Sequence, residues 1–155
     1  MKIKINQKAP NFKLPSTNGT KFELNNLKKK NIVLYFYPKD DTPGCTLESQ
    51  DFSKLNNMIL KNKTVIYGIS ADSIQSHLNF KKKYKIKFQL LSDINKKVIK
   101  KYGVWGKKIF MGKNYMGIIR TTFLIDSNRK VLKIWNNVRV KDHAKDVYSE
   151  IKKIV

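Results

Sequence analysis

Short apolar runs alternate with stretches of helical periodicity in the first half of the chain. Near-continuous apolar runs at 32–37 and 65–70 are typical of strands that are buried on both faces of a sheet. Each run is followed by a stretch whose apolar residues recur with the spacing of a helix, at about 46–61 and 73–83. This order predicts two buried strands, each followed by a helix.

The segment before the first buried strand has the alternating pattern of a short hairpin. Phe12 and Leu14 alternate with polar residues, and Phe22 and Leu24 do the same on the return. The sequence Thr17-Asn18-Gly19 between them is typical of a turn. The chain is therefore expected to begin with a β-hairpin.

The second half repeats the alternation and then changes to paired strands. The expected elements are a strand at 88–91, a helix at 94–101, two strands at 120–126 and 130–135, and a helix from about Asp142. Ser127-Asn128 separates the two strands and is expected to form a hairpin turn.

The order of the expected elements predicts the fold class. Strands that alternate with helices, followed by an antiparallel hairpin and a closing helix, indicate a mixed α/β sandwich. A thioredoxin-like fold fits this order, with a central mixed β-sheet flanked by helices and an N-terminal β-hairpin. The 155 residues suffice for one core, and no repeat or linker divides them, so a single domain over 1–155 is expected.

Several classes of protein do not fit the chain. The longest strongly apolar run, 32–37, is far shorter than the roughly 20 residues of a membrane span, so no membrane partner is expected. The N-terminus lacks the apolar core of a secretory signal. The single cysteine, which cannot form an internal disulfide, favours a reducing compartment, and we expect a cytoplasmic protein.

The formal net charge of +22 has two explanations. Such a charge is typical of proteins that bind nucleic acid or another polyanion. However, the 33 basic residues are 30 Lys and only 3 Arg, whereas nucleic-acid readers tend to use arginine. Lys, Asn and Ile share AT-rich codons, so a base-biased genome also explains the charge. Nucleic acid is therefore not an expected partner.

The candidate chemistry is centred on Cys45. This cysteine lies in the segment Pro38-Lys39-Asp40-Asp41-Thr42-Pro43-Gly44-Cys45-Thr46, between the strand expected at 32–37 and the helix that follows. At a strand-to-helix turn, a thiol meets the positive end of the helix dipole and free backbone N–H groups. Both stabilise the thiolate, which is the reactive form of cysteine.

Blocks of residues across almost the whole chain carry a family resemblance. They are Ala9–Phe12, Leu34–Thr46, Tyr102–Gly106, Met116–Asp126 and His143-Ala144. In this order they resemble the bacterioferritin-comigratory-protein (PrxQ) branch of the peroxiredoxins, which are thiol enzymes that reduce peroxides. The Pro38–Cys45 stretch with a downstream arginine is the specific part, because Thr-x2-Cys alone would be a weak signal.

The resemblance implies a role for each residue of the motif. Cys45 would be the peroxidatic nucleophile, which attacks a peroxide oxygen and becomes a sulfenic acid. Thr42 and Arg120 would hold the peroxide and the thiolate, and Pro38 would shield the thiolate from water. The backbone N–H groups of Gly44 and Cys45 would bind the peroxide oxygens, while Pro43 has no N–H to offer.

Other polar residues have structural alternatives. Thr42 could simply cap the helix, and Glu48 could either favour the helix dipole or orient Arg120. His77 and His143 are expected to be structural or exposed, and with one cysteine they form no metal-binding spacing. No metal and no cofactor are expected. The two tryptophans, Trp105 and Trp135, are expected to pack in the core or at its rim.

The chain departs from the family at the resolving position. Many members carry a second cysteine five residues after the first, but here that position is Gln50. There is therefore no resolving cysteine, and an external thiol must reduce the sulfenic acid through a mixed disulfide. Thioredoxin is the expected reductant, with glutaredoxin and glutathione as alternatives. Without a resolving thiol, Cys45 is also expected to be more prone to overoxidation.

The leading hypothesis is a one-cysteine thiol peroxidase for hydrogen peroxide and organic hydroperoxides, acting in antioxidant defence as a monomer or weak homodimer. The alternative is a basic polyanion-binding protein on the same scaffold with weak peroxidase activity. A thioredoxin-type reductase is disfavoured because the chain lacks Cys-x-x-Cys.

Overall fold

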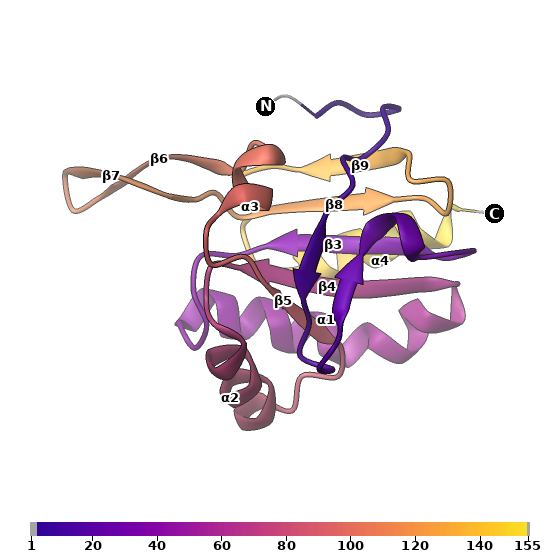
Figure 1. The fold of residues 1–155 in the computed structure, drawn as a ribbon, viewed down its shortest axis with the longest axis horizontal. Helices are drawn as coiled ribbons and strands as arrows, with labels where there is room; N and C mark the ends of the chain where they lie inside the picture. Colours follow the sequence, from indigo (N-terminus) through magenta and orange to yellow (C-terminus); the bar gives the residue numbers. More distant parts are fainter. Residues whose placement is uncertain (1–2, 155) are drawn as a thin grey trace.

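A five-stranded mixed sheet forms the centre of the molecule, in the strand order β5-β4-β3-β8-β9 (Figure 1). The computed structural model describes residues 3–154, so Met1, Lys2 and Val155 of the expected domain lie outside the described residues. The strands are β1 Lys13–Pro15, β2 Lys21–Glu23, β3 Asn31–Phe36, β4 Thr64–Ser70, β5 Gln89–Ser92, β6 Trp105–Phe110, β7 Lys113–Ile118, β8 Thr121–Ile125 and β9 Val131–Trp135. The helices are α1 Pro43–Lys61, α2 Ile74–Tyr84, α3 Lys97–Lys101 and α4 His143–Lys152, with a short 3-10 turn η1 at Leu24–Asn26.

The central strand β3 divides the core into two layers. It runs parallel to β4 and antiparallel to β8, and all six of its residues are buried. Because successive side chains point to opposite faces, Val33 and Tyr35 contact the layer under α1 and α4. Leu34 and Phe36 contact the opposite layer, under the β1–β2 hairpin and α3. Figure 1 shows α1 and α4 behind the sheet and the β1–β2 hairpin in front of it.

The structure confirms the expected α/β thioredoxin-like fold with its N-terminal hairpin. That the chain forms a single domain stays a prediction. None of the helices in the described part of the chain combines the length and apolar content needed to cross a membrane.

Two boundaries differ from the sequence prediction by more than one residue. Helix α1 begins at Pro43 rather than at 46, because proline is well suited to the first position of a helix, where no N–H is needed. Helix α3 covers only Lys97–Lys101 of the expected 94–101, since Lys96 takes a left-handed conformation with φ 63°.

One element of the structure has no counterpart among those expected from the sequence. Strands β6 and β7 form an antiparallel hairpin that does not join the central sheet. Figure 1 shows this hairpin projecting from the body of the molecule, beyond the end of the central strands. We call it the β6–β7 arm.

Candidate active site

Cys45 lies in the first turn of α1, directly after the loop that follows β3. Its side chain is buried, with 1% of its surface exposed. The first helical hydrogen bond is donated by the N–H of Thr46 to the carbonyl of Thr42, at 2.9 Å. The N–H groups of Gly44 and Cys45 precede this bond, so they have no acceptor within the helix. They are available to bind oxygen atoms at the positive end of the helix.

Arg120 joins the cysteine to a buried acid. Its Nη2 donates to Cys45 Sγ at 3.4 Å, and its Nη1 donates to Glu48 Oε1 at 2.7 Å. Strand pairing brings the two segments together, because Phe36 at the end of β3 lies opposite Thr121, the residue after Arg120. Cys45 and Arg120, which are 75 positions apart in the sequence, are therefore in direct contact.

Glu48 lies one helical turn after Cys45 and has 1% of its surface exposed. Burial raises the pKa of the Glu48 carboxyl to about 7, although the charge of Arg120 and its hydrogen bond act in the opposite direction. Among the described residues, no donor reaches Glu48 Oε2. Near neutral pH this carboxyl is therefore close to the point at which it gains or loses a proton.

Gly44 leaves room for Arg120. A Cβ atom at this position would lie 3.1 Å from Arg120 Nη2. Gly44 already belongs to α1, and the close approach of the guanidinium favours a residue without a side chain there.

Thr42 is the N-cap residue of α1, but its side chain does not cap the helix. Its Oγ1 donates to the carbonyl of Lys39 at 2.9 Å, and no hydrogen bond from its side chain caps the helix. A purely capping role for Thr42 is therefore wrong.

A hollow of about 470 Å³ opens beside Arg120, the residue that contacts Cys45 Sγ. Pro38 and Arg120 line it together with Ile119, Lys107, Lys108, Ile109, Asn137 and Val138. Lys107, Lys108 and Ile109 come from the β6–β7 arm, which the sequence analysis did not predict. Their contribution was missed for that reason, and the run of two lysines and an isoleucine carries no signal of a binding site.

The two histidines lie in the core. His143 Nε2 is 2.8 Å from Thr122 Oγ1, and burial lowers its pKa to about 4. His77 lies in α2, where its Nδ1 is 2.7 Å from Asp40 Oδ2 and its Nε2 is 2.8 Å from the carbonyl of Leu91. Both histidines are structural, as expected. Trp105 and Trp135, half-buried at the edges of the two core layers, confirm the expected packing.

Asp40, Asp72 and His77 lie close enough to one another to be considered as metal ligands. Each of the three side chains is already hydrogen-bonded within the protein. Asp40 accepts from Tyr37 and Ser76, and Asp72 accepts from Ser70 and from the backbone of Asp40. The cluster therefore anchors the loop between β3 and α1, and nothing in its geometry requires a metal.

Known proteins are similar to this chain in both sequence and fold. The model of the AhpC/TSA family matches residues 5–134. A putative peroxiredoxin Bcp of Coxiella burnetii is 45% identical over 97% of this chain and 100% of its own length. Peroxiredoxin Bcp of Bacillus subtilis is 44% identical over 98% of this chain and 97% of its own length.

Solved structures agree with these relatives. The peroxiredoxin Q of Xanthomonas campestris superposes with a TM-score of 0.87 at 37% identity, over 92% of this chain and 90% of its own. For the bacterioferritin comigratory protein of the same species, trapped intermediate and ligand complexes describe alkyl peroxide reduction, and the TM-score is 0.86 at 37% identity, over 91% of this chain and 90% of its own. This chain therefore belongs to the AhpC/TSA family, as a peroxiredoxin of the Bcp (PrxQ) branch that carries a single cysteine.

Proposed function

We propose that this peroxiredoxin reduces hydrogen peroxide and organic hydroperoxides through a Cys45 sulfenic acid that an external thiol then reduces. The observation that supports it most is the position of Arg120, whose guanidinium contacts both Cys45 Sγ and Glu48. A cation beside the sulfur stabilises the thiolate and leaves further N–H groups directed at the place where a peroxide would bind.

The reaction assigns a task to each residue. The Cys45 thiolate attacks one peroxide oxygen, the O–O bond breaks, and the other oxygen leaves with the electron pair and takes up a proton. Arg120 and the N–H groups of Gly44 and Cys45 stabilise the charge that moves onto the leaving oxygen. Thr42 holds the peroxide, and Pro38 excludes water from the thiolate.

Glu48 acts as a positioning residue. Its Oε1 fixes the guanidinium of Arg120 by a charge-assisted hydrogen bond of 2.7 Å. The buried carboxyl does not line the hollow and is hydrogen-bonded to Arg120, so its effect reaches the reaction through that residue.

The reductant is a separate thiol, because Cys45 is the only cysteine of the chain. We propose a thioredoxin, with glutaredoxin or glutathione as the alternatives, in a reducing compartment such as the cytoplasm. Because no resolving cysteine is present, sulfinate formation under excess peroxide should be greater in the wild type than in Gln50→Cys. Equal sulfinate yields, measured by intact mass, would contradict this expectation.

The experiment that tests the peroxidase is rapid mixing of the reduced protein with one equivalent of hydrogen peroxide. Intact mass and a sulfenate trap should show a single oxygen on Cys45, formed far faster than on a free thiol. Arg120→Lys keeps the charge but loses the fork that contacts both partners, and we expect it to be slower by about 100-fold.

The result also decides between the two functions. An oxidation rate like that of an ordinary thiol, together with salt-sensitive affinity for nucleic acid, would favour the polyanion-binding alternative.

A further inference from the structure

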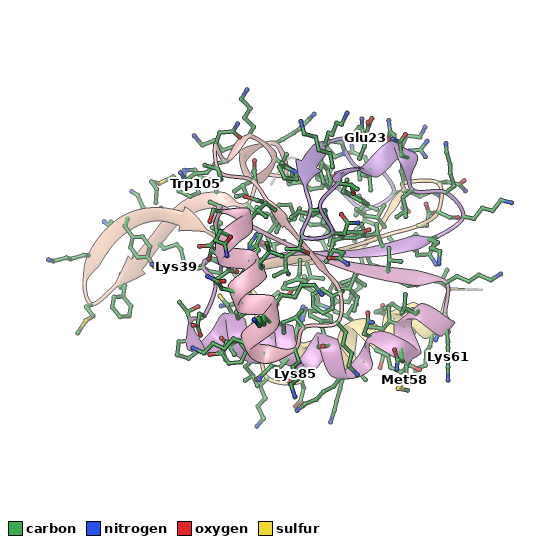
Figure 2. All side chains as sticks on the ribbon, turned by 60° about the horizontal axis from the view of Figure 1, so that its bottom comes forward. Glu23, Lys39, Met58, Lys61, Lys85 and Trp105 are labelled. Carbon is green, nitrogen blue, oxygen red and sulfur yellow. The ribbon has the colours of Figure 1, made fainter. Side chains whose placement is uncertain are left out.

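The β6–β7 arm carries the most exposed apolar side chains of the described residues. Ile109, Phe110 and Met111 at its tip are exposed by 73%, 66% and 87%, and Tyr115 and Met116 on the return strand are also exposed. Figure 2 shows the side chains of the arm standing clear of the rest of the molecule, on the side of Trp105. Burying such side chains is favourable, so their exposure at one tip indicates a surface that contacts something else.

The apolar side chains lie on both faces of the arm. In the antiparallel register Phe110 lies opposite Lys113, and Lys108 lies opposite Tyr115, so Phe110 and Tyr115 share one face. Ile109 belongs to the other face, as does Met116. A protein surface would cover one face of a flat ribbon, whereas a lipid layer surrounds an inserted tip on all sides.

The turn at the tip carries an unusual residue. Met111 and Gly112 both have positive φ, at 51° and 78°, as in the two-residue turns that favour Asn-Gly. A methionine is strained in this conformation and gains nothing from packing, because its side chain is almost fully exposed. The backbone of the turn does not explain methionine here, but an apolar environment at the tip does.

Lysines border the apolar tip. Lys107 and Lys108 precede it and Lys113 follows it, and residues 105–118 include no acidic side chain. Phe110 lies two residues beyond Lys108, and a strand rises about 3.3 Å per residue. If Lys108 lies at the lipid headgroups, Phe110 therefore reaches roughly 7 Å deeper into the bilayer, which is the depth of interfacial insertion. The exposed side chains of Lys107 and Lys113 at that boundary can reach the lipid phosphates, whereas Lys108 Nζ donates to the carbonyl of Ile118 at 3.0 Å.

We propose that the tip of the β6–β7 arm inserts into the interface of an anionic lipid bilayer and brings Cys45 to hydroperoxides of membrane acyl chains. This inference rests on the proposed peroxidase function for its substrate. The hollow beside Arg120 supports it, because Ile109 of the arm lines the same hollow as Pro38 and Arg120, and Arg120 contacts Cys45 Sγ. A bilayer that holds the tip therefore lies next to the opening of the site.

The chemistry is the same two-electron step. The Cys45 thiolate forms a bond to the terminal oxygen of the lipid hydroperoxide, and the O–O bond breaks. The electron pair goes to the lipid oxygen, which takes up a proton and becomes a lipid alcohol, while the sulfur becomes a sulfenic acid. The external thiol of the proposed function then condenses with the sulfenic acid to a mixed disulfide, with the loss of water, and a second thiol releases the Cys45 thiol and leaves the reductant as a disulfide.

The test compares charge-matched variants of the full chain on vesicles. The variant Phe110→Ser/Met111→Ser removes the apolar tip and leaves the net charge unchanged. The control Met58→Ser/Leu60→Ser makes the same kind of change on α1, where both side chains are exposed; Figure 2 shows Met58 at the far end of the molecule from Trp105. Each protein is sedimented with vesicles of phosphatidylcholine alone and with added phosphatidylglycerol, at low and high salt.

The wild type and the control should still bind the anionic vesicles at high salt. The affinity of the tip variant for these vesicles at high salt should be at least about tenfold lower. The tip variant should also reduce phosphatidylcholine hydroperoxide in the anionic vesicles about tenfold more slowly, at an unchanged rate with hydrogen peroxide.

Three results would overturn the inference. Equal vesicle binding by the tip variant and the wild type would show that lysines alone hold the protein to lipid. A dimer lost only in the tip variant, by analytical ultracentrifugation, would identify the arm as a self-interface. Slower reduction by thioredoxin with unchanged vesicle binding would identify a docking site for the reductant. Failure of the peroxidase itself would appear separately, as slow oxidation of Cys45 by hydrogen peroxide in all three proteins.

Discussion

At the scale of single residues, the site depends on one guanidinium that is held between two acidic groups. Arg120 contacts Cys45 and Glu48, and Gly44 leaves the space that this contact requires. The sequence identified Cys45 from its place before a helix, but the approach of Arg120 followed only from the family resemblance. The local sequence pattern does not predict this contact, because it depends on the pairing of β3 with β8.

The buried carboxyl of Glu48 should make folding stability depend on pH. Its pKa is raised to about 7 in the folded protein, above its ordinary value of 4.5, so the folded state holds the proton more tightly. Stability is therefore highest below the ordinary pKa and falls as pH rises from there to about 7, by up to ~3 kcal/mol. Urea unfolding at several pH values should show this fall in the wild type and not in Glu48→Gln. An equal slope in the two proteins would mean that another group titrates.

Gly44→Ala should separate stability from reactivity. Alanine in a helix is more favourable than glycine by up to about 1 kcal/mol, so thermal unfolding should not be impaired. The new Cβ would displace Arg120 Nη2, and we expect oxidation of Cys45 to slow by about tenfold, which is part of the effect of losing an oxyanion donor. Asn57→Ala, at an exposed position of α1, is the control that improves the helix and should leave the rate unchanged.

At the scale of elements, the sequence predicted the parts with regular burial and missed the part without it. Strand β3 is recognisable because every residue is buried, and α4 because its inner face is apolar. The β6–β7 arm has exposed isoleucine, phenylalanine and methionine on both faces, so neither alternation nor a continuous apolar run marks its strands. A hairpin that does not pack against the core lacks the periodic apolar positions from which strands are predicted.

The loop between β3 and α1 is anchored by Asp40, and this anchor should matter for both stability and rate. Asp40 accepts hydrogen bonds from Tyr37 and Ser76 and lies against His77 in the interior. Asp40→Asn replaces an acceptor by a donor there, and we expect a loss of about 2–3 kcal/mol in unfolding free energy and slower oxidation of Cys45.

The neighbouring acid provides the matched control. Asp41 lies in an exposed pair with Lys83, and Asn tolerates its left-handed φ of 59°. Asp41→Asn should cost less than about 1 kcal/mol. If the two variants were equally stable, the buried network around Asp40 would not be what holds the loop.

At the scale of the whole molecule, the charge of +22 should affect the two half-reactions differently. Hydrogen peroxide is neutral, so its rate with Cys45 should change little as salt is raised. A protein reductant with an acidic surface is attracted by the field, and its rate should fall as the Debye length shortens. Stopped-flow measurements with hydrogen peroxide, an acidic thioredoxin and the uncharged thiol dithiothreitol would test this. Salt dependence with dithiothreitol as well would indicate an effect on the site itself.

The burial of Cys45 also affects its two reaction partners, the peroxide and the reducing thiol, differently because they differ in size. With only 1% of its residue exposed, the sulfur leaves room for little more than the two oxygens of a hydroperoxide group, and a protein thiol cannot approach it in line without displacing its surroundings. We therefore expect the first turn of α1 to loosen in the oxidised protein before an external thiol can reduce it. The N-terminal end of α1 would then control both fast oxidation by peroxide and slower reduction by a thiol. The lifetime of the oxidised form would depend on how often that end opens.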